Sequence, residues 1–209
     1  AVDWLTTEGV NIVSFSMANP IGGPGDGTGP AADIVARAAD AGILWVNSAG
    51  NSAENHWSGK WKDQDGDDSL EFGAGDESNV FTLAAGESAT IFLKWNDPWE
   101  GSCNDYQLAV YDSSGSLVSL GFDNAQDCGT APPREKAVVW ATFTDDFSVK
   151  VNRVSADGQA SFDLFVECGG SCSELEHVTP EGSIEPPADA ANALAVGAVD
   201  VHSPGTIED

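Results

Sequence analysis

The stretch ILWVNSAGN (residues 43–51) decides how the first part of the chain is interpreted. Residues 43–47 are a short, largely apolar run, as expected of a strand covered on both faces of a sheet. Before it, residues 31–41 (AADIVARAADA) follow Pro30 with apolar residues on one helical face, and residues 11–17 (NIVSFSM) have strand length and composition. Strand, helix and strand with short connections predict a right-handed parallel βαβ unit.

The pattern changes after residue 52. Between residues 70 and 167 short segments with period-two apolar residues alternate with turn residues such as Asp97-Pro98 and Asp157-Gly158. This spacing predicts an antiparallel sandwich or jelly roll. Residues 173–187 are polar and contain proline, which is typical of a linker, and residues 193–199 (ALAVGAV) are again a small apolar strand.

These segments predict an α/β parallel-sheet fragment interrupted by an all-β jelly-roll or sandwich insertion. The expected boundaries are 1–51 for the α/β segment, 52–187 for the insertion with its linker, and 188–209 for the strand that returns to the sheet. The alternative is two independent domains in tandem with a stray terminal strand. Insertion is favoured because a single small apolar strand has nothing else to pair with.

The charge balance restricts the partners of the chain. Eight Lys and Arg residues against 34 Asp and Glu give a net charge of −26. Such a chain repels nucleic acid and anionic membrane surfaces, so neither is an expected partner. With 41% apolar residues and 7 tryptophans it is not a disordered acidic tail, and no apolar run approaches the roughly 18–20 residues that span a bilayer.

Four cysteines lie in the middle of the chain. An even number in an acidic, lysine-poor protein favours two disulfides and an oxidising, extracellular compartment. The simplest pairing joins Cys103 to Cys128 and Cys168 to Cys172, although the other two pairings stay open. A structural zinc site is the rival interpretation, but CxxC spacing and the usual histidine spacing are both missing.

Three segments resemble the subtilisin-like serine protease family, in that family's order and spacing. Residues 1–17 (AVDWLTTEGVNIVSFSM) are similar to its helix and substrate-binding strand, and residues 43–51 to its strand that ends in Ala-Gly-Asn. Residues 186–200 (PPADAANALAVGAVD) are similar to its later strand. The resemblance implies part of a secreted serine endopeptidase that acts on protein or peptide substrates.

The resemblance also implies roles for individual residues. Asn51 matches the asparagine whose side-chain amide donates to the oxyanion of the tetrahedral intermediate. The other matched positions are the substrate-binding strand, at Ser16, Met17 and Ala18, and the opposite wall of the specificity pocket, at Ser48, Ala49 and Gly50. The sequence departs from the family at Met17 and Ala18, where Leu and Gly are usual.

The catalytic Asp, His and Ser motifs of that family would fall before Ala1 and after Asp209. The chain is therefore expected to be inactive alone, and no cofactor is expected for catalysis. Without the rest of such an enzyme, apolar surface would be exposed at the sheet, which predicts either a homo-oligomer through the exposed sheet edge or local disorder there.

The predicted insertion resembles the pre-peptidase-type β-domains of secreted proteases, through residues 80–83 (VFTL), 92–98 (FLKWNDP) and 104–112 (NDYQLAVYD). It is expected to modulate substrate access or stability. The competing interpretation of the chain is a non-catalytic extracellular β-sandwich that binds a glycan or a protein. A glycan platform could be formed by Trp57, Trp61, Trp95 and Trp99, but core or interdomain packing is the favoured interpretation of these residues.

Two acidic groups are candidates for a structural calcium ion, which takes six to eight oxygen ligands. The preferred group is Asp63, Asp65 and Asp67, which alternate around Gly66. The weaker group is Asp97, Asn104, Asp105 and Asp112, placed at the ends of consecutive predicted strands. The alternative is that both groups are ordinary solvated turns of an acidic protein.

Overall fold

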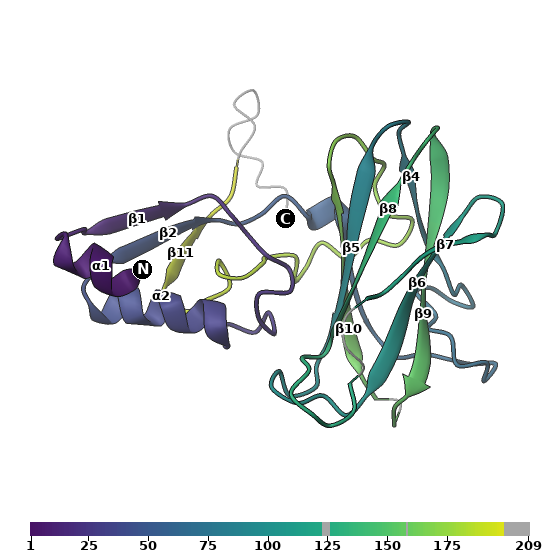
Figure 1. Ribbon diagram of the computed structural model, residues 1–209, viewed down its shortest axis with the longest axis horizontal. Helices are drawn as coiled ribbons and strands as arrows, with labels where there is room; N and C mark the ends of the chain where they lie inside the picture. The colour runs from purple at the N-terminus through teal and green to yellow at the C-terminus, as the bar shows by residue number, and fades with distance from the viewer. Residues whose placement is uncertain (123–125, 158, 199–209) are drawn as a thin grey trace. The chain divides into compact units, whose positions relative to one another are not determined.

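The computed structural model describes residues 1–122, 126–157 and 159–198, which form two compact units (Figure 1). The sheet unit consists of Ala1–Asn51 together with Glu181–Asp209, and the sandwich unit consists of Ser52–Pro180. Residues 181–187, which the sequence analysis assigned to the linker of the insertion, are therefore grouped with the sheet unit. Residues 199–209 of the predicted returning segment lie outside the described residues.

The sheet unit contains three parallel strands in the order β1–β2–β11. Helix α2 begins with Pro30 in its first turn and buries Ala32, Val35 and Ala38, which are spaced three residues apart and so lie on one face. Gly42 (φ 78°) reverses the chain after the helix. The elements are α1 (Val2–Thr7), β1 (Ile12–Phe15), α2 (Pro30–Asp40), β2 (Leu44–Ser48) and β11 (Ala193–Val196).

One face of this sheet is packed and the other is not. Trp45 is buried in a cluster with Val35 and Ala38 of α2, and Val13 and Ala193, its register partners in β1 and β11, pack against the same cluster. Side chains alternate along a strand, so their neighbours point the other way. Those neighbours are exposed: Ile12 by 61%, Leu44 by 46% and Leu194 by 52%. Parallel sheets are ordinarily covered on both faces.

The sandwich unit consists of two four-stranded antiparallel sheets, β3–β10–β5–β8 and β4–β9–β6–β7. Turn glycines with positive φ, such as Gly86 and Gly115, separate consecutive strands. The strands are β3 (His56–Lys60), β4 (Asn79–Leu83), β5 (Ser88–Trp95), β6 (Asp105–Asp112), β7 (Leu117–Leu120), β8 (Arg134–Trp140), β9 (Asp145–Ser155) and β10 (Ser161–Cys168), preceded by the short 3₁₀ helix η1 (Ala53–Asn55).

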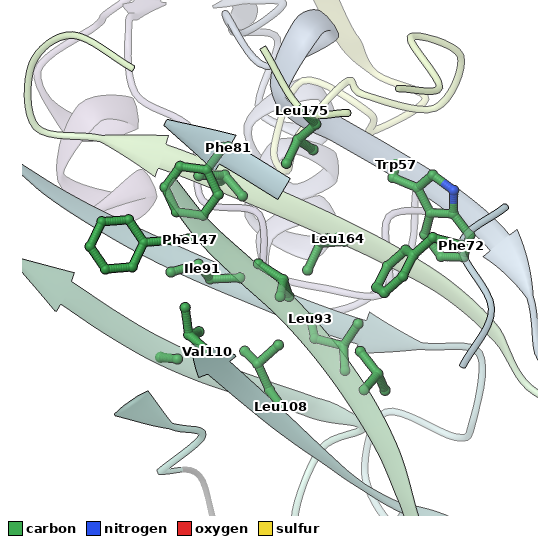
Figure 2. Close-up of a cluster of buried hydrophobic side chains, with 14 of the residues drawn as sticks. Trp57, Phe72, Phe81, Ile91, Leu93, Leu108, Val110, Phe147, Leu164 and Leu175 are labelled. Atoms are coloured by element: carbon green, nitrogen blue, oxygen red, sulfur yellow. The ribbon is translucent and has the colours of Figure 1, made fainter. Parts of the chain in front are cut away.

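The core of the sandwich unit is built from alternate residues of both sheets. Figure 2 shows Ile91, Leu93 and Leu164 from one sheet close to Leu108 and Val110 from the other. All five are fully buried. The period-two pattern of the sequence therefore corresponds directly to the inward face of each sheet.

Both disulfides belong to the sandwich unit. Cys103 is bonded to Cys128 and Cys168 to Cys172, the simplest of the pairings considered from the sequence. No cysteine of the chain remains free, which removes the thiolate ligands of the rival zinc interpretation. Disulfides of this kind are compatible with an extracellular protein. Neither helix in the described residues is long and apolar enough to cross a bilayer.

The fold class predicted from the sequence, an α/β parallel-sheet fragment of the subtilisin-like type interrupted by an all-β jelly-roll or sandwich insertion, is wrong for this chain. The structure is mostly β, with 38% strand and 10% helix, and eight of the eleven strands of the described residues lie in antiparallel sheets. The prediction gave most weight to residues 1–51 and to the short returning strand. Those segments form a three-stranded sheet, while the sandwich unit supplies most of the regular structure.

Candidate functional site

The two predicted walls of a substrate cleft lie at the same edge of the sheet unit. Strands β1 and β2 are adjacent and parallel, with Phe15 in register with Asn47. Ser16, Met17 and Ala18 continue from the end of β1. Ser48 is the last residue of β2, and Ala49 and Gly50 follow it. The carboxyl ends of neighbouring parallel strands are where ligands of such sheets bind.

Asn47 connects these two walls, and the sequence analysis gave it no role. Its side chain is 1% exposed and its Nδ2 donates to the carbonyl oxygens of Ser48 (2.9 Å) and Met17 (3.4 Å). Its Oδ1 accepts a hydrogen bond from the indole N–H of Trp45 (3.1 Å). A buried amide satisfied in this way holds the ends of β1 and β2 together. The sequence signal that could have identified Asn47 is its amide side chain at the end of an otherwise apolar run, residues 43–47.

Asn51 lies just beyond the end of β2 with its side chain exposed. Among the described residues its amide has no hydrogen-bond partner, so its N–H groups are available to a ligand. The preceding turn is constrained: Gly50 has φ +104°, and a Cβ there would lie 3.4 Å from the Glu185 carboxylate. The N–H of Ala49 donates to the carbonyl of Val196 (3.0 Å), which fixes the chain on the β11 side.

An apolar pocket of about 350 Å³ adjoins the first wall. Met17 and Ala18 line it together with Trp45 of β2 and Ile34 of α2. Pro186 and Pro187 also line it, and the N–H of Asn19 donates to the carbonyl of Pro186 (3.0 Å). The second wall, Ser48–Gly50, does not line this pocket. The sequence analysis missed the contribution of the two prolines because nothing local marks a contact across so long a separation.

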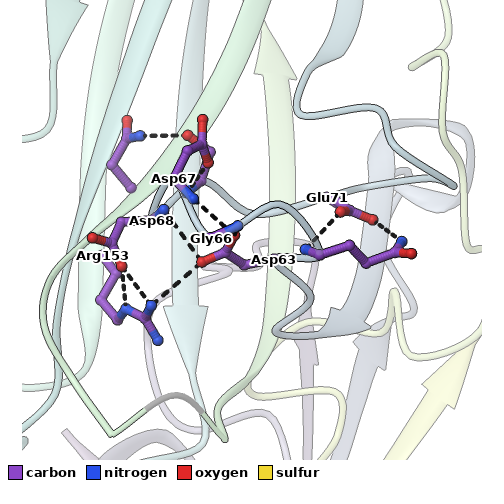
Figure 3. A network of polar contacts seen from close by, with 9 residues as sticks. Asp63, Gly66, Asp67, Asp68, Glu71 and Arg153 are labelled. Atoms are coloured by element: carbon purple, nitrogen blue, oxygen red, sulfur yellow. Dashed lines mark hydrogen bonds and ion pairs between the residues drawn. The ribbon is translucent and has the colours of Figure 1, made fainter.

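In the sandwich unit, the acidic group Asp63, Asp65 and Asp67 lies in one loop. Figure 3 shows two of its members, Asp63 and Asp67. The Asp63 Oδ1 accepts hydrogen bonds from the N–H groups of Gly66 (2.7 Å) and Asp67 (3.1 Å). One carboxylate oxygen of each of the three residues lies within 4.8 Å of the others. This geometry is able to hold a metal ion.

Arg153 from β9 already supplies one positive charge to this loop (Figure 3). Its guanidinium pairs with Asp63 (3.3 Å), whose side chain is only 5% exposed, and with Asp68. The hydrogen bond with Asp68 raises the pKa of Arg153 above its ordinary value. Asp65 and Asp67 are exposed and are not paired with the guanidinium, so these two carboxylates are the ones open to a further cation.

The second acidic group predicted from the sequence does not form a single site. Asp97 accepts hydrogen bonds from Ser102 (2.7 Å) and Asn104 (2.7 Å). Burial opposes ionisation of Asp97, but these hydrogen bonds outweigh it and lower its pKa. Asp105 and Asp112 are the first and last residues of β6, and Asp112 accepts hydrogen bonds from its own turn at Ser114 and Ser116. Including Asp112 in the group was therefore an error.

Packing, the interpretation favoured from the sequence, describes three of the four tryptophans, Trp57, Trp61 and Trp95. Trp57 and Trp95 are buried in the core of the sandwich unit, with exposures of 6% and 3%. Trp61 packs against Tyr106, with ring centroids 5.3 Å apart. Trp99 lies outside the strands. Because Trp57, Trp61 and Trp95 pack in or against the core, the four tryptophans do not present a row of aromatic faces to a polysaccharide.

Comparison with known proteins gives a structural match. No protein-family model matches the chain, and no curated protein matches its sequence. Among solved structures, the chain is similar to the Clostridium perfringens CspB protease, with a TM-score of 0.60 and 12% sequence identity. The match covers 95% of this chain and 44% of that protease. The chain thus spans less than half of the length of that protease, and nearly all of this chain shares the fold of the matched part.

Proposed function

We propose that this chain is part of a secreted serine endopeptidase related to the subtilisin-like family. The observation that carries the proposal is the parallel pairing of β1 and β2, which ends both strands at one edge of the sheet unit. An apolar pocket adjoins the residues after β1, and the exposed amide of Asn51 follows β2. The fold shared with a protease supports it, as do the three segments of sequence that resemble the family.

The chemistry assigned to Asn51 is stabilisation of negative charge. When a peptide carbonyl is attacked, its oxygen becomes an oxyanion, and a fixed amide N–H lowers the energy of that transition state. Asn51 follows β2 and a constrained Gly50, so the backbone sets the point from which its side chain extends. Asn47 and Trp45 act as positioning residues, since they hold the strand from which Asn51 extends.

The apolar pocket is assigned to an apolar side chain of the substrate. Met17 is 67% exposed beside it, and residues 16–18 continue an edge strand of the sheet. An extended peptide can pair with such an edge through main-chain hydrogen bonds while its side chains enter a pocket. Because the chain carries a net charge of −26, acidic peptides would be disfavoured as substrates.

The sandwich unit is assigned a role in substrate access or in stability. Its first residue, Ser52, directly follows Asn51 along the chain, so the candidate oxyanion donor and the sandwich unit are covalently adjacent. The exposed face of the sheet unit around Ile12, Leu44 and Leu194 is assigned to contact with the remainder of the enzyme. If that remainder is missing, association between copies of the chain through the exposed sheet would cover the same surface.

The proposal is tested by comparing the complete protein with residues 1–209. The complete protein should hydrolyse apolar peptides and be inactivated by a serine-directed fluorophosphonate, because the nucleophile, base and orienting acid are proposed to lie outside this chain. Residues 1–209 alone should show no hydrolysis and no labelling. Absence of any peptidase activity in the complete protein, or activity that resists the fluorophosphonate, would refute the proposal.

We also propose that Asp63, Asp65 and Asp67 bind Ca²⁺ as a structural ion. The loop offers three carboxylates, and carbonyl oxygens and water would complete the coordination. Extracellular calcium modules often bind with dissociation constants of about 10⁻⁴–10⁻³ M. At tenfold excess over such a constant the ion would stabilise the folded state by roughly 1.4 kcal/mol.

The calcium proposal predicts a thermal shift that depends on two carboxylates. Ca²⁺ at about 5 mM should raise Tm by a few degrees, and EDTA should reverse the rise. The double variant D65N/D67N should not respond, although Arg153 keeps its pairs with Asp63 and Asp68. D33N/D40N on α2 removes the same charge elsewhere and should respond like the parent chain. An identical response of both double variants would argue against the site.

A further inference from the structure

A second group of metal-ligating side chains lies in the sandwich unit, away from the candidate cleft and from the Asp63 loop. His177 and Glu176 come from the segment by which the chain leaves the sandwich, and Asp76 comes from the loop that precedes β4. The His177 Nε2 is 3.0 Å from Asp76 Oδ2. One ligand atom from each of the three residues lies within 4.8 Å of the others.

The position of His177 is fixed by its surroundings. Asn79, which is fully buried, donates from Nδ2 to the His177 carbonyl (2.9 Å) and accepts from the His177 N–H on Oδ1 (2.9 Å). The imidazole rests against Gly73, where a Cβ would approach Cε1 to within 2.7 Å. Glycine at residue 73 therefore leaves the space that the ring occupies, so the histidine is held before any ligand arrives.

Asp76 is held equally firmly. Its Oδ1 accepts hydrogen bonds from both the N–H and the hydroxyl of Ser78, each at 3.0 Å. The carboxylate faces the imidazole of His177 through its other oxygen.

The donor set distinguishes this group from the Asp63 loop. One imidazole nitrogen and two carboxylates suit Zn²⁺ and other first-row transition ions, whereas Ca²⁺ prefers oxygen ligands alone. We propose that Asp76, Glu176 and His177 form a Zn²⁺ site, with water in the fourth position. The ion would replace the hydrogen bond between His177 and Asp76, and it would tie the exit segment of the sandwich to the loop before β4.

The test is Zn²⁺ titration of the full chain after removal of metal with EDTA, followed by calorimetry and thermal denaturation. The parent should bind one Zn²⁺ with a rise in Tm of several degrees. H177A should weaken Zn²⁺ binding by at least tenfold while the calcium response of the Asp63 loop persists. That response also shows that the variant is folded.

A matched pair of variants separates a built site from general attraction to an acidic chain. E176Q removes a proposed ligand, and E174Q removes the same charge from an exposed residue of the same segment. E176Q should weaken Zn²⁺ binding by at least tenfold, and E174Q should leave it within twofold. Equal affinities for E176Q, E174Q and the parent, or undiminished binding in H177A, would overturn the proposal.

Discussion

Under the proposed function, replacing Asn51 by alanine in the complete protein is expected to lower kcat by about 10²–10³-fold with little change in KM. That magnitude comes from the subtilisin-like family itself, where one oxyanion donor was removed. The substitution acts on kcat because the amide contributes to the charged transition state more than to the bound substrate. The measurement is steady-state hydrolysis of an apolar peptide by the parent and N51A enzymes.

Two comparisons make the Asn51 result specific. N51D keeps the shape of the side chain but replaces the donating amide by a carboxylate, so it should lose at least as much activity as N51A. N11A removes an amide from another exposed residue of the sheet unit and should retain full activity. All three variants should unfold with the parent's Tm to within a few degrees, because the Asn51 amide has no partner among the described residues. A kcat for N51A within threefold of the parent would exclude the assigned role.

The inward faces of the sandwich could be predicted from the sequence because alternation is a local property. Ala89, Ile91, Leu93 and Trp95 are two residues apart, and all four are in the core. The same local reasoning misjudged the chain's fold class, since a few well-patterned segments near the ends outweighed the many strands between them. A count of predicted strand residues would have favoured a mainly β chain.

The contacts that form the candidate sites could not be predicted in this way, because they join residues that are distant in sequence. Asn47 reaches the carbonyl of Met17 across 30 positions, and Arg153 reaches Asp63 across 90. No periodicity encodes such pairs. The error with Asp112 was avoidable: Asp105 and Asp112 begin and end one strand, and seven steps of about 3.3 Å place their backbones some 23 Å apart.

Replacing Leu164 by alanine is expected to destabilise the sandwich unit by about 2–5 kcal/mol. Leu164 is fully buried on β10, where it is in register with Trp57 of β3 on one side and Leu93 of β5 on the other. Truncation removes apolar area and leaves a cavity, because strands held by hydrogen bonds on both sides cannot close around the gap. Urea denaturation followed by tryptophan fluorescence, with both disulfides intact, gives the difference in free energy of unfolding.

Leu117 provides the matched control, since the same substitution removes the same atoms from a side chain that is 48% exposed on the edge strand β7. L117A should change the free energy of unfolding by no more than about 0.5 kcal/mol. The difference between the two variants measures burial in the core, independently of the leucine's intrinsic preference for a strand. Losses of similar size in L164A and L117A would mean that β10 is not the centre of a packed two-sheet core.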